Sequence, residues 1–320
     1  MANRKITSVL RQQPKLTGQI GNTIIYVRPD LEDQQVDIVE NGRYTIKANK
    51  GFDALNSVEV NADVKPTPPD KGMVITAYTE SGYIDKIELY GTTTSSNMVN
   101  TSNITEAKIA TGVTKLGDRT LSSRSYLTTV SIPSTVTDIG TSAFESCKVL
   151  EHLTLPDGLN TVGQSAFFQC RKLTLNALPS KWTYIQQGTF QYCESLAITK
   201  LDNVTRIDNV GFGSCTSLTQ VSMPKIQTIN NGAFSSCTNL KAVWIGSEVK
   251  STLGKTAFNY CNNIIRMFID LPRATVETFT NYQYSFMNNT AKTGIIVCND
   301  DPGFITKEEF DAIDWSTYTE

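Results

Sequence analysis

Residues 135–156 read TVTDIGTSAFESCKVLEHLTLP, and this stretch recurs along the chain with small changes. In it, Phe144 precedes Cys147 by three residues, and Leu150 follows three residues later. The same Phe-x-x-Cys-x-x-Leu/Ile pattern appears six times, with the cysteines separated by 23, 23, 22, 22 and 24 residues. A period this regular predicts a stack of similar units, each of which buries its apolar edge only against its neighbours.

Within each unit, the Phe and the Cys are predicted to share one face of a helical turn, because they are three residues apart. A short alternating stretch such as Val130, Ile132 and Pro133 then predicts a half-buried strand that ends at the proline. A degenerate earlier copy carries Leu121, Arg124 and Leu127 at the Phe, Cys and Leu positions. The predicted core of the repeats consists of Phe144, Cys147, Phe167, Cys170, Phe190, Cys193, Phe212, Cys215, Phe234, Cys237, Phe258 and Cys261.

The repeat length lies in the range of leucine-rich repeats, which sets the predicted fold class. We expect a mainly β protein with short helical turns, namely a leucine-rich-repeat solenoid of about seven coils. A small N-terminal domain rich in β-hairpins is expected to precede it. The strand pattern is weakest in the third and fourth repeats, where LTLNALP and LAITKLD shift the strand register.

Changes in composition divide the chain into five predicted segments. The first hairpin is expected within 37–64, with Asn41-Gly42 at its turn. Near the C-terminus, Thr306 and Glu309 form a capping-box signature before a short helix. The segments are a β module at 1–62, a Pro-rich linker at 63–72, a β-hairpin that caps the first coil at 73–100, the repeats at 101–272, and a C-terminal cap with a final strand and a short helix at 273–320.

Charge and composition exclude several classes of protein. The chain has 29 Lys and Arg against 31 Asp and Glu, a net charge of -2, which argues against a nucleic-acid-binding protein. No apolar run is long enough to span a membrane, and the N-terminus has no apolar core of a secretory signal. With one histidine and no nucleophile elbow or phosphate loop, the chain is not expected to be an enzyme, and no cofactor or metal is expected.

Three features have alternative interpretations. The cysteine column is interpreted as a set of small buried apolar side chains, against a disulfide ladder or a soft-metal site. Asp300 and Asp301 are interpreted as a turn before the last helix, against a calcium site, which needs six to eight oxygen ligands. His152 is interpreted as a surface residue, because the sequence shows no nucleophile or carboxylate partner for a catalytic histidine.

Strand positions that point away from the core predict a shared outer face. Exposed Trp, Arg and Phe side chains are typical anchors of protein interfaces, and aromatic rings also stack on sugars. The alternative is that the C-terminal helix or the loop 273–292 covers Trp244 and Phe268. The candidate partner-binding residues are His152, Gln220, Trp244, Arg266 and Phe268.

The pattern Leu-x-x-Val-x-Ile-Pro, Val-x-x-Ile-Gly, Ala-Phe-x-x-Cys resembles the BspA-type leucine-rich repeat, and residues 135–156 are close to its consensus. The resemblance covers about half of the chain. It implies a non-enzymatic surface that binds proteins or glycans, often on bacterial cell envelopes.

Residues 37–64 resemble small β modules of phage and prophage tail and baseplate proteins. The resemblance lies at Asn41, Gly42, Tyr44, Gly51, Phe52, Asp53, Val58, Val60 and Asn61. It implies a virion structural protein of the tail, baseplate or a fibre, assembled in the host cytoplasm. Its N-terminal region would dock on other virion proteins, and its repeats would bind a host surface protein or glycan.

That hypothesis is compatible with a homo-oligomer such as a trimer, although no coiled-coil heptads encode one. The alternative is a bacterial cell-surface adhesin, against which we count the missing export signal.

Overall fold

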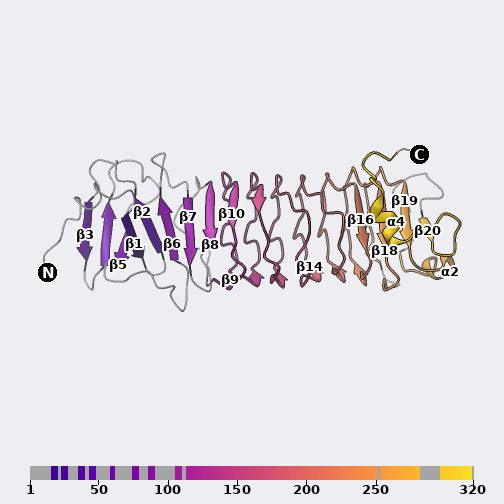
Figure 1. Ribbon diagram of the computed structural model, residues 1–320, viewed down its shortest axis with the longest axis horizontal. Helices are drawn as coiled ribbons and strands as arrows, with labels where there is room; N and C mark the ends of the chain where they lie inside the picture. Colours follow the sequence, from indigo (N-terminus) through magenta and orange to yellow (C-terminus); the bar gives the residue numbers. More distant parts are fainter. Residues whose placement is uncertain are drawn as a thin grey trace.

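The computed structural model describes residues 105–109, 113–250, 253–281 and 296–318 with their side chains, and the strand backbones between residues 16 and 90. Successive coils stack along the long axis of Figure 1, and most of them carry two short strands and a turn that holds the Phe and the Cys. The predicted solenoid of about seven coils is confirmed. Among the described residues, no helix has the length and hydrophobicity that crossing a bilayer requires.

The first strand of each coil is called the A strand. β8 pairs in parallel with β10, and β10 with β12, while β16, β18, β19 and β20 form a second parallel set. The A strands are β8 (Glu106–Ile109), β10 (Thr129–Ser131), β12 (His152–Leu153), β16 (Gln220–Met223), β18 (Ala242–Ile245), β19 (Arg266–Ile269) and β20 (Ile296–Cys298).

The second strand of each coil is called the B strand. β9, β11 and β13 pair in parallel in one sheet, and β14, β15 and β17 in another. In Figure 1, β8 and β10 lie toward the upper edge of the solenoid and β9 and β14 toward the lower. The B strands are β9 (Lys115–Leu116), β11 (Asp138–Ile139), β13 (Thr161–Val162), β14 (Tyr184–Ile185), β15 (Arg206–Ile207) and β17 (Thr228–Ile229).

The N-terminal strands form hairpins, as predicted. β4 (Arg43–Lys47) pairs antiparallel with both β3 (Gln35–Val39) and β5 (Val58–Asn61), while β1 (Leu16–Ile20) pairs with β2 (Thr23–Val27). β6 (Val74–Tyr78) pairs antiparallel with β7 (Lys86–Tyr90), and β7 continues in parallel onto β8. This hairpin lies where the sequence analysis predicts a cap on the first coil, while Asn41-Gly42 and the linker 63–72 lie outside the described residues.

The core is one apolar cluster that extends from Ala107 in β8 to Cys298 in β20. Each of the six repeat phenylalanines is at most 1% exposed, and each repeat cysteine is fully buried. Neighbouring rings stack with centroids 5.2 to 5.5 Å apart from Phe144 to Phe258. Such aromatic pairs contribute about 0.5–1.5 kcal/mol each beyond burial. The predicted Phe column is confirmed as the spine of the solenoid.

The cysteines are free thiols, and each of the six in the column, from Cys147 to Cys261, donates to a carbonyl of the coil before it. Cys170 Sγ donates to the Phe144 carbonyl at 3.0 Å, and Cys193 Sγ to the Phe167 carbonyl at 3.1 Å. Cys215, Cys237 and Cys261 repeat this contact on the Phe one coil earlier. Burial raises the pKa of Cys147 to about 12, so this thiol keeps the proton that it donates. The interpretation of the column as small buried side chains is confirmed, with a hydrogen bond added to each.

Two backbone positions in each coil are left-handed. They lie two residues before and two residues after the column phenylalanine, with φ between 50° and 63°. Gly188 and Gly232 occupy the earlier position in two coils, whereas Val210 occupies it in the coil between them with φ 50°. A β-branched residue in this region is strained, because its Cβ crowds the backbone.

Replacing Val210 with glycine is therefore expected to stabilise the protein by about 1 kcal/mol, the relief of left-handed strain exceeding the entropic cost of glycine. Urea denaturation of the two proteins measures the difference. Val210→Ala serves as the control, because it keeps the Cβ and is expected to give no gain. If alanine stabilises as much as glycine, the strain is not the cause.

The sheets are interrupted at the third and fourth coils. Leu175 and Ile198 are buried five residues after their cysteines, whereas Leu153 is buried six residues after Cys147. A shift of one residue reverses the faces of a strand. Accordingly, no A strand lies between β12 and β16 in the described chain, where the isolated bridge Lys200–Ser222 stands. The register change noted in the sequence is confirmed.

The B-strand sheet is divided at the same place. Trp182 is buried at the position that Leu159 holds one coil earlier, and its ring lies 5.4 Å from that of Phe190. Its Nε1 donates to the Tyr184 carbonyl at 2.7 Å. We attribute the break in the sheet between β13 and β14 to the bulk of the Trp182 indole, because the smaller Leu159 holds the same position one coil earlier.

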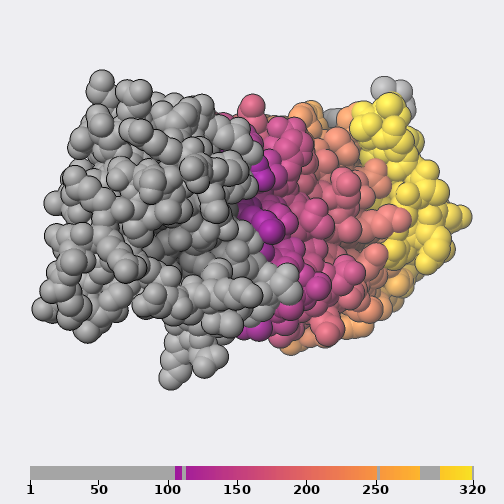
Figure 2. All heavy atoms as spheres, turned by 60° about the vertical axis from the view of Figure 1, so that its left-hand side comes forward, coloured from indigo at the N-terminus to yellow at the C-terminus, as the bar shows by residue number. Residues whose placement is uncertain are grey.

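The C-terminal segment caps the last coils. Its helix α4 (Lys307–Ala312) begins with the predicted capping box, in which the Thr306 side chain and the Glu309 side chain each accept a backbone N–H. The short helix α2 (Arg273–Val276) precedes the final strand β20. In the space-filling view, the yellow C-terminal segment covers the end of the solenoid beside the orange coils (Figure 2).

Candidate interaction surface

The outward side of the A strands, here called the A flank, is open over the first coils. Thr129 pairs with His152 across β10 and β12, and the imidazole is exposed. Ser131, Thr154 and Thr174 are exposed beside it and line a shallow hollow of about 360 Å³. The surface location predicted for His152 is confirmed, and its surroundings are hydroxyl-bearing side chains.

Over the last coils the A flank is covered by the chain itself. Trp244 is 5% exposed and Phe268 is 3% exposed, and both pack with Phe310 and Trp315. Trp244 Nε1 donates to the Ile305 carbonyl at 3.1 Å, and the Trp315 N–H donates to Gln220 Oε1 at 3.3 Å.

The prediction that Gln220, Trp244 and Phe268 present a partner-binding face is thus wrong for this structure, because residues 304–318 occupy that face. The alternative of a cap is the one observed. Arg266 is half-buried at the edge of the cap, and its guanidinium donates to the Ile265 carbonyl at 2.9 Å. Of the five candidate residues, His152 remains the one on the open flank.

At the interruption, a second hollow of about 310 Å³ lies next to the cap. It is lined by residues of the third and fourth coils, including Trp182, Lys200 and Asp202. Two ion pairs connect this edge to α4, Lys200 with Asp311 at 3.3 Å and Lys307 with Asp202 at 3.1 Å. Both lie partly in solvent, so they position the helix more than they stabilise it.

The outward side of the B strands, here called the B flank, carries a cluster that the sequence analysis missed. Arg206 lies over the Tyr184 ring, with its guanidinium carbon 5.0 Å from the ring centroid. Asp208 accepts hydrogen bonds from the Tyr184 hydroxyl, from Arg206 Nε at 2.8 Å and from Asn230 Nδ2 at 2.6 Å. Partial burial opposes the charge of Asp208, but these donors prevail and its pKa is lowered. Tyr184 and Arg206 hold outward positions in TYIQQ (183–187) and TRIDN (205–209), so the alternation along these two strands could have pointed to them.

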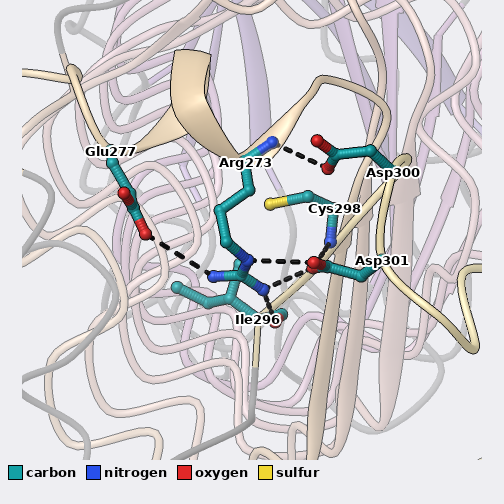
Figure 3. Close-up of polar contacts among 6 residues, drawn as sticks. All are labelled: Arg273, Glu277, Ile296, Cys298, Asp300 and Asp301. Carbon is teal, nitrogen blue, oxygen red and sulfur yellow. Dashed lines mark hydrogen bonds and ion pairs between the residues drawn. The ribbon is translucent and has the colours of Figure 1, made fainter.

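A group of three potential metal ligands lies at the C-terminal end of the solenoid. Among the described residues, the ligand atoms of Cys298, Asp300 and Asp301 come within 4.8 Å of one another. Figure 3 shows that Arg273 binds both carboxylates. Its Nε donates to Asp301 Oδ1 at 3.0 Å, and its backbone N–H donates to Asp300 Oδ1 at 2.8 Å. Burial raises the pKa of Cys298 to about 11, so its thiol is protonated. Asp300 and Asp301 lie in a turn between β20 and the last helix, as predicted, and Arg273 joins this turn to α2, which the sequence analysis did not predict.

This junction makes the cap sensitive to acid. Hydrogen bonds from Arg273, and then from the Cys298 N–H, lower the pKa of Asp301. Because the folded-state pKa lies below the unfolded value of about 3.9, the stabilisation is complete above that pH and is lost as the pH falls through the lower value. The difference in melting temperature between the native protein and Asp301→Asn is therefore expected to shrink below about pH 4. A difference that stays constant down to pH 2 would contradict this assignment.

Comparison with known proteins identifies the repeats. The family model described as BspA type Leucine rich repeat region matches residues 92–219 and 205–300, with six copies. Among solved structures, the chain is similar to a leucine-rich repeat protein of T. pallidum, with 24% identity over 67% of this chain and 94% of that chain and a TM-score of 0.48.

Two further solved structures are similar. A leucine-rich repeat protein from Bacteroides ovatus has 18% identity over 65% of this chain and 71% of its own, with a TM-score of 0.45. A leucine rich cell surface protein from Faecalibacterium prausnitzii has 18% identity over 88% and 96%, with a TM-score of 0.31. No curated protein matches the chain. The family match spans residues 92–300, more than half of the 320 residues.

Proposed function

This chain belongs to the BspA-type leucine-rich repeat family, and we propose that it is a non-enzymatic recognition scaffold of a bacterial cell surface. The observation that carries the proposal is the exposed polar surface that successive coils present on the B flank and on the first coils of the A flank. Most buried apolar side chains form one core from Ala107 to Cys298, and a smaller cluster lies under the cap. Outward positions of successive coils form extended surfaces on the B flank and on the first coils of the A flank. Extended surfaces of this kind are what repeat proteins use to bind macromolecules.

The cell-surface role is the alternative function of the sequence analysis. The virion hypothesis rests on residues 41–61, which precede the start of the family match at residue 92, so the comparisons give it no support. Docking on other virion proteins, a trimeric state and a host receptor as ligand stay predictions of that hypothesis. Within the surface proposal, the partner is a protein or a glycan that meets the open flanks.

Labelling of intact cells tests the proposal. An antibody against the folded chain is expected to bind unpermeabilised cells of the source bacterium, and mass spectrometry is expected to find the chain in the envelope fraction. Cells in which the gene is deleted provide the control for antibody specificity. Recovery of the chain in purified phage particles, with none in the envelope, would defeat the proposal in favour of the virion hypothesis.

A further inference from the structure

The B flank from β13 to β17 combines one aromatic ring with a column of amides that lie two residues past the end of each strand. Gln164, Gln187, Asn209 and Asn231 stand at the same position of four successive coils, and all four side chains are exposed. Each backbone carbonyl of this column accepts an N–H from the coil before it, at 2.9 to 3.0 Å. The amides are therefore displayed from a fixed backbone at regular intervals.

Their spacing follows from the strand pairing. Neighbouring strands of a sheet lie about 4.7–4.9 Å apart, which is comparable to the length of one pyranose residue. A linear sugar chain that runs along the solenoid would thus advance by about one ring for each coil. Side-chain amides both donate and accept hydrogen bonds, as sugar hydroxyls do.

The charge of this flank is balanced. The guanidinium of Arg206 is paired with Asp208, and the same carboxylate holds the Tyr184 hydroxyl and the Asn230 amide. β13 and β17 flank β14 and β15, and their outward residues, Thr161 and Thr228, are uncharged. A polyanion would find no net positive charge here, which makes a neutral ligand the better match.

The apolar content also distinguishes ligand classes. Protein interfaces are centred on several buried aromatic or aliphatic anchors. On this stretch of the B flank, Tyr184 is the one exposed large apolar side chain among the described residues, at 37% exposure. The Arg206 guanidinium lies over one face of this ring, so a sugar would stack its C–H face on the opposite face, beside the hydrogen-bonded hydroxyl.

We propose that Tyr184, Arg206 and the amide column of the B flank bind a neutral, linear polysaccharide whose axis runs along the solenoid. This inference rests on the proposed recognition function and names the chemical class of its partner. Tyr184 supplies the stacking surface, and Arg206 keeps its ring in place. Gln187, Asn209 and Asn231 bond hydroxyls of successive sugar residues.

The test is titration calorimetry of the full chain with neutral oligosaccharides of three to six residues, namely β-1,4-linked glucose, mannose and xylose, and with heparin as the acidic polymer. We expect at least one neutral series to bind, with affinity that rises with chain length and is unchanged between low and high salt. Tyr184→Ala, and separately Asn209→Ala with Asn231→Ala, are each expected to weaken binding about tenfold.

The matched control is Asn239→Ala with Asn262→Ala, which removes two exposed amides from the turns after Cys237 and Cys261. This pair is expected to leave the affinity unchanged, and circular dichroism shows that each variant is folded. Equal weakening by the control pair would overturn the site.

Binding of heparin alone, or no binding of any sugar, would overturn the ligand class. If the chain labels the cell surface but binds no neutral sugar, this inference fails and the proposed function stands. If it binds the sugar but is absent from the envelope, the proposed function fails and the sugar site stands.

Discussion

Replacing Gly246 with alanine is expected to lower the free energy of unfolding by about 3 kcal/mol or more. Gly246 follows β18 and donates its N–H to the Met223 carbonyl of the preceding coil at 3.1 Å. A Cβ at this position would lie 1.9 Å from the Pro224 carbonyl oxygen and 2.6 Å from its carbon. Because these are backbone atoms, the two coils must separate before the methyl group fits.

Thermal unfolding followed by circular dichroism measures the effect, with an expected decrease in melting temperature of about 6–12 °C. Gly158→Ala is the matched control, because its Cβ would meet Ser134 O at 3.6 Å, an ordinary contact. That variant is expected to melt within a degree or two of the native protein. Similar losses in both variants would show that the close approach of the coils is not what matters.

Replacing Phe268 with alanine is expected to cost about 3–5 kcal/mol and to release the cap. Its ring centroid lies 6.0 Å from those of Phe310 and Trp315 and 6.3 Å from that of Phe304. Loss of this ring removes the shared contact of residues 304–318 with β19. Trp244 is then expected to enter water, because the same segment covers it.

Limited proteolysis and tryptophan fluorescence test this prediction. The variant is expected to be cleaved near residue 304 at protease concentrations that leave the native chain intact, and its emission is expected to shift to the red. Tyr126→Ala is the control, since Tyr126 is 61% exposed and distant from the cap in sequence. A lower melting temperature with no change in cleavage would show that Phe268 stabilises the coils but does not hold the cap. Sugar binding on the B flank is expected to persist in this variant.

The sequence predicted the core well because the core is periodic. The columns of Phe144 and Cys147 are visible as spacings, and stacking brings equal positions together in any regular solenoid. The thiol bonds were not predictable in the same way. Cys170 reaches the Phe144 carbonyl across 26 residues, and that offset depends on the path of the chain around each coil.

The candidate face was predicted less well, for a related reason. Alternation along β18 and β19 correctly directs Trp244 and Phe268 away from the solenoid core. It does not say whether another segment lies over them, and that segment begins at Phe304, outside the repeat. The capping box at Thr306 and Glu309 predicted the helix but not where it packs. Tyr184 and Arg206 were overlooked because their interaction joins two coils that differ in sequence.

The direction of the thiol bonds bears on how the chain folds during synthesis. Each column cysteine from Cys147 to Cys261 donates to a carbonyl 25 to 27 residues earlier. A coil that emerges from the ribosome therefore meets an acceptor that has already been made. Folding can advance from the N-terminus at the pace of translation, one coil at a time. Residues 304–318 are translated after the repeats, so Trp244 and Phe268 stay uncovered on the nascent chain until this segment has been made.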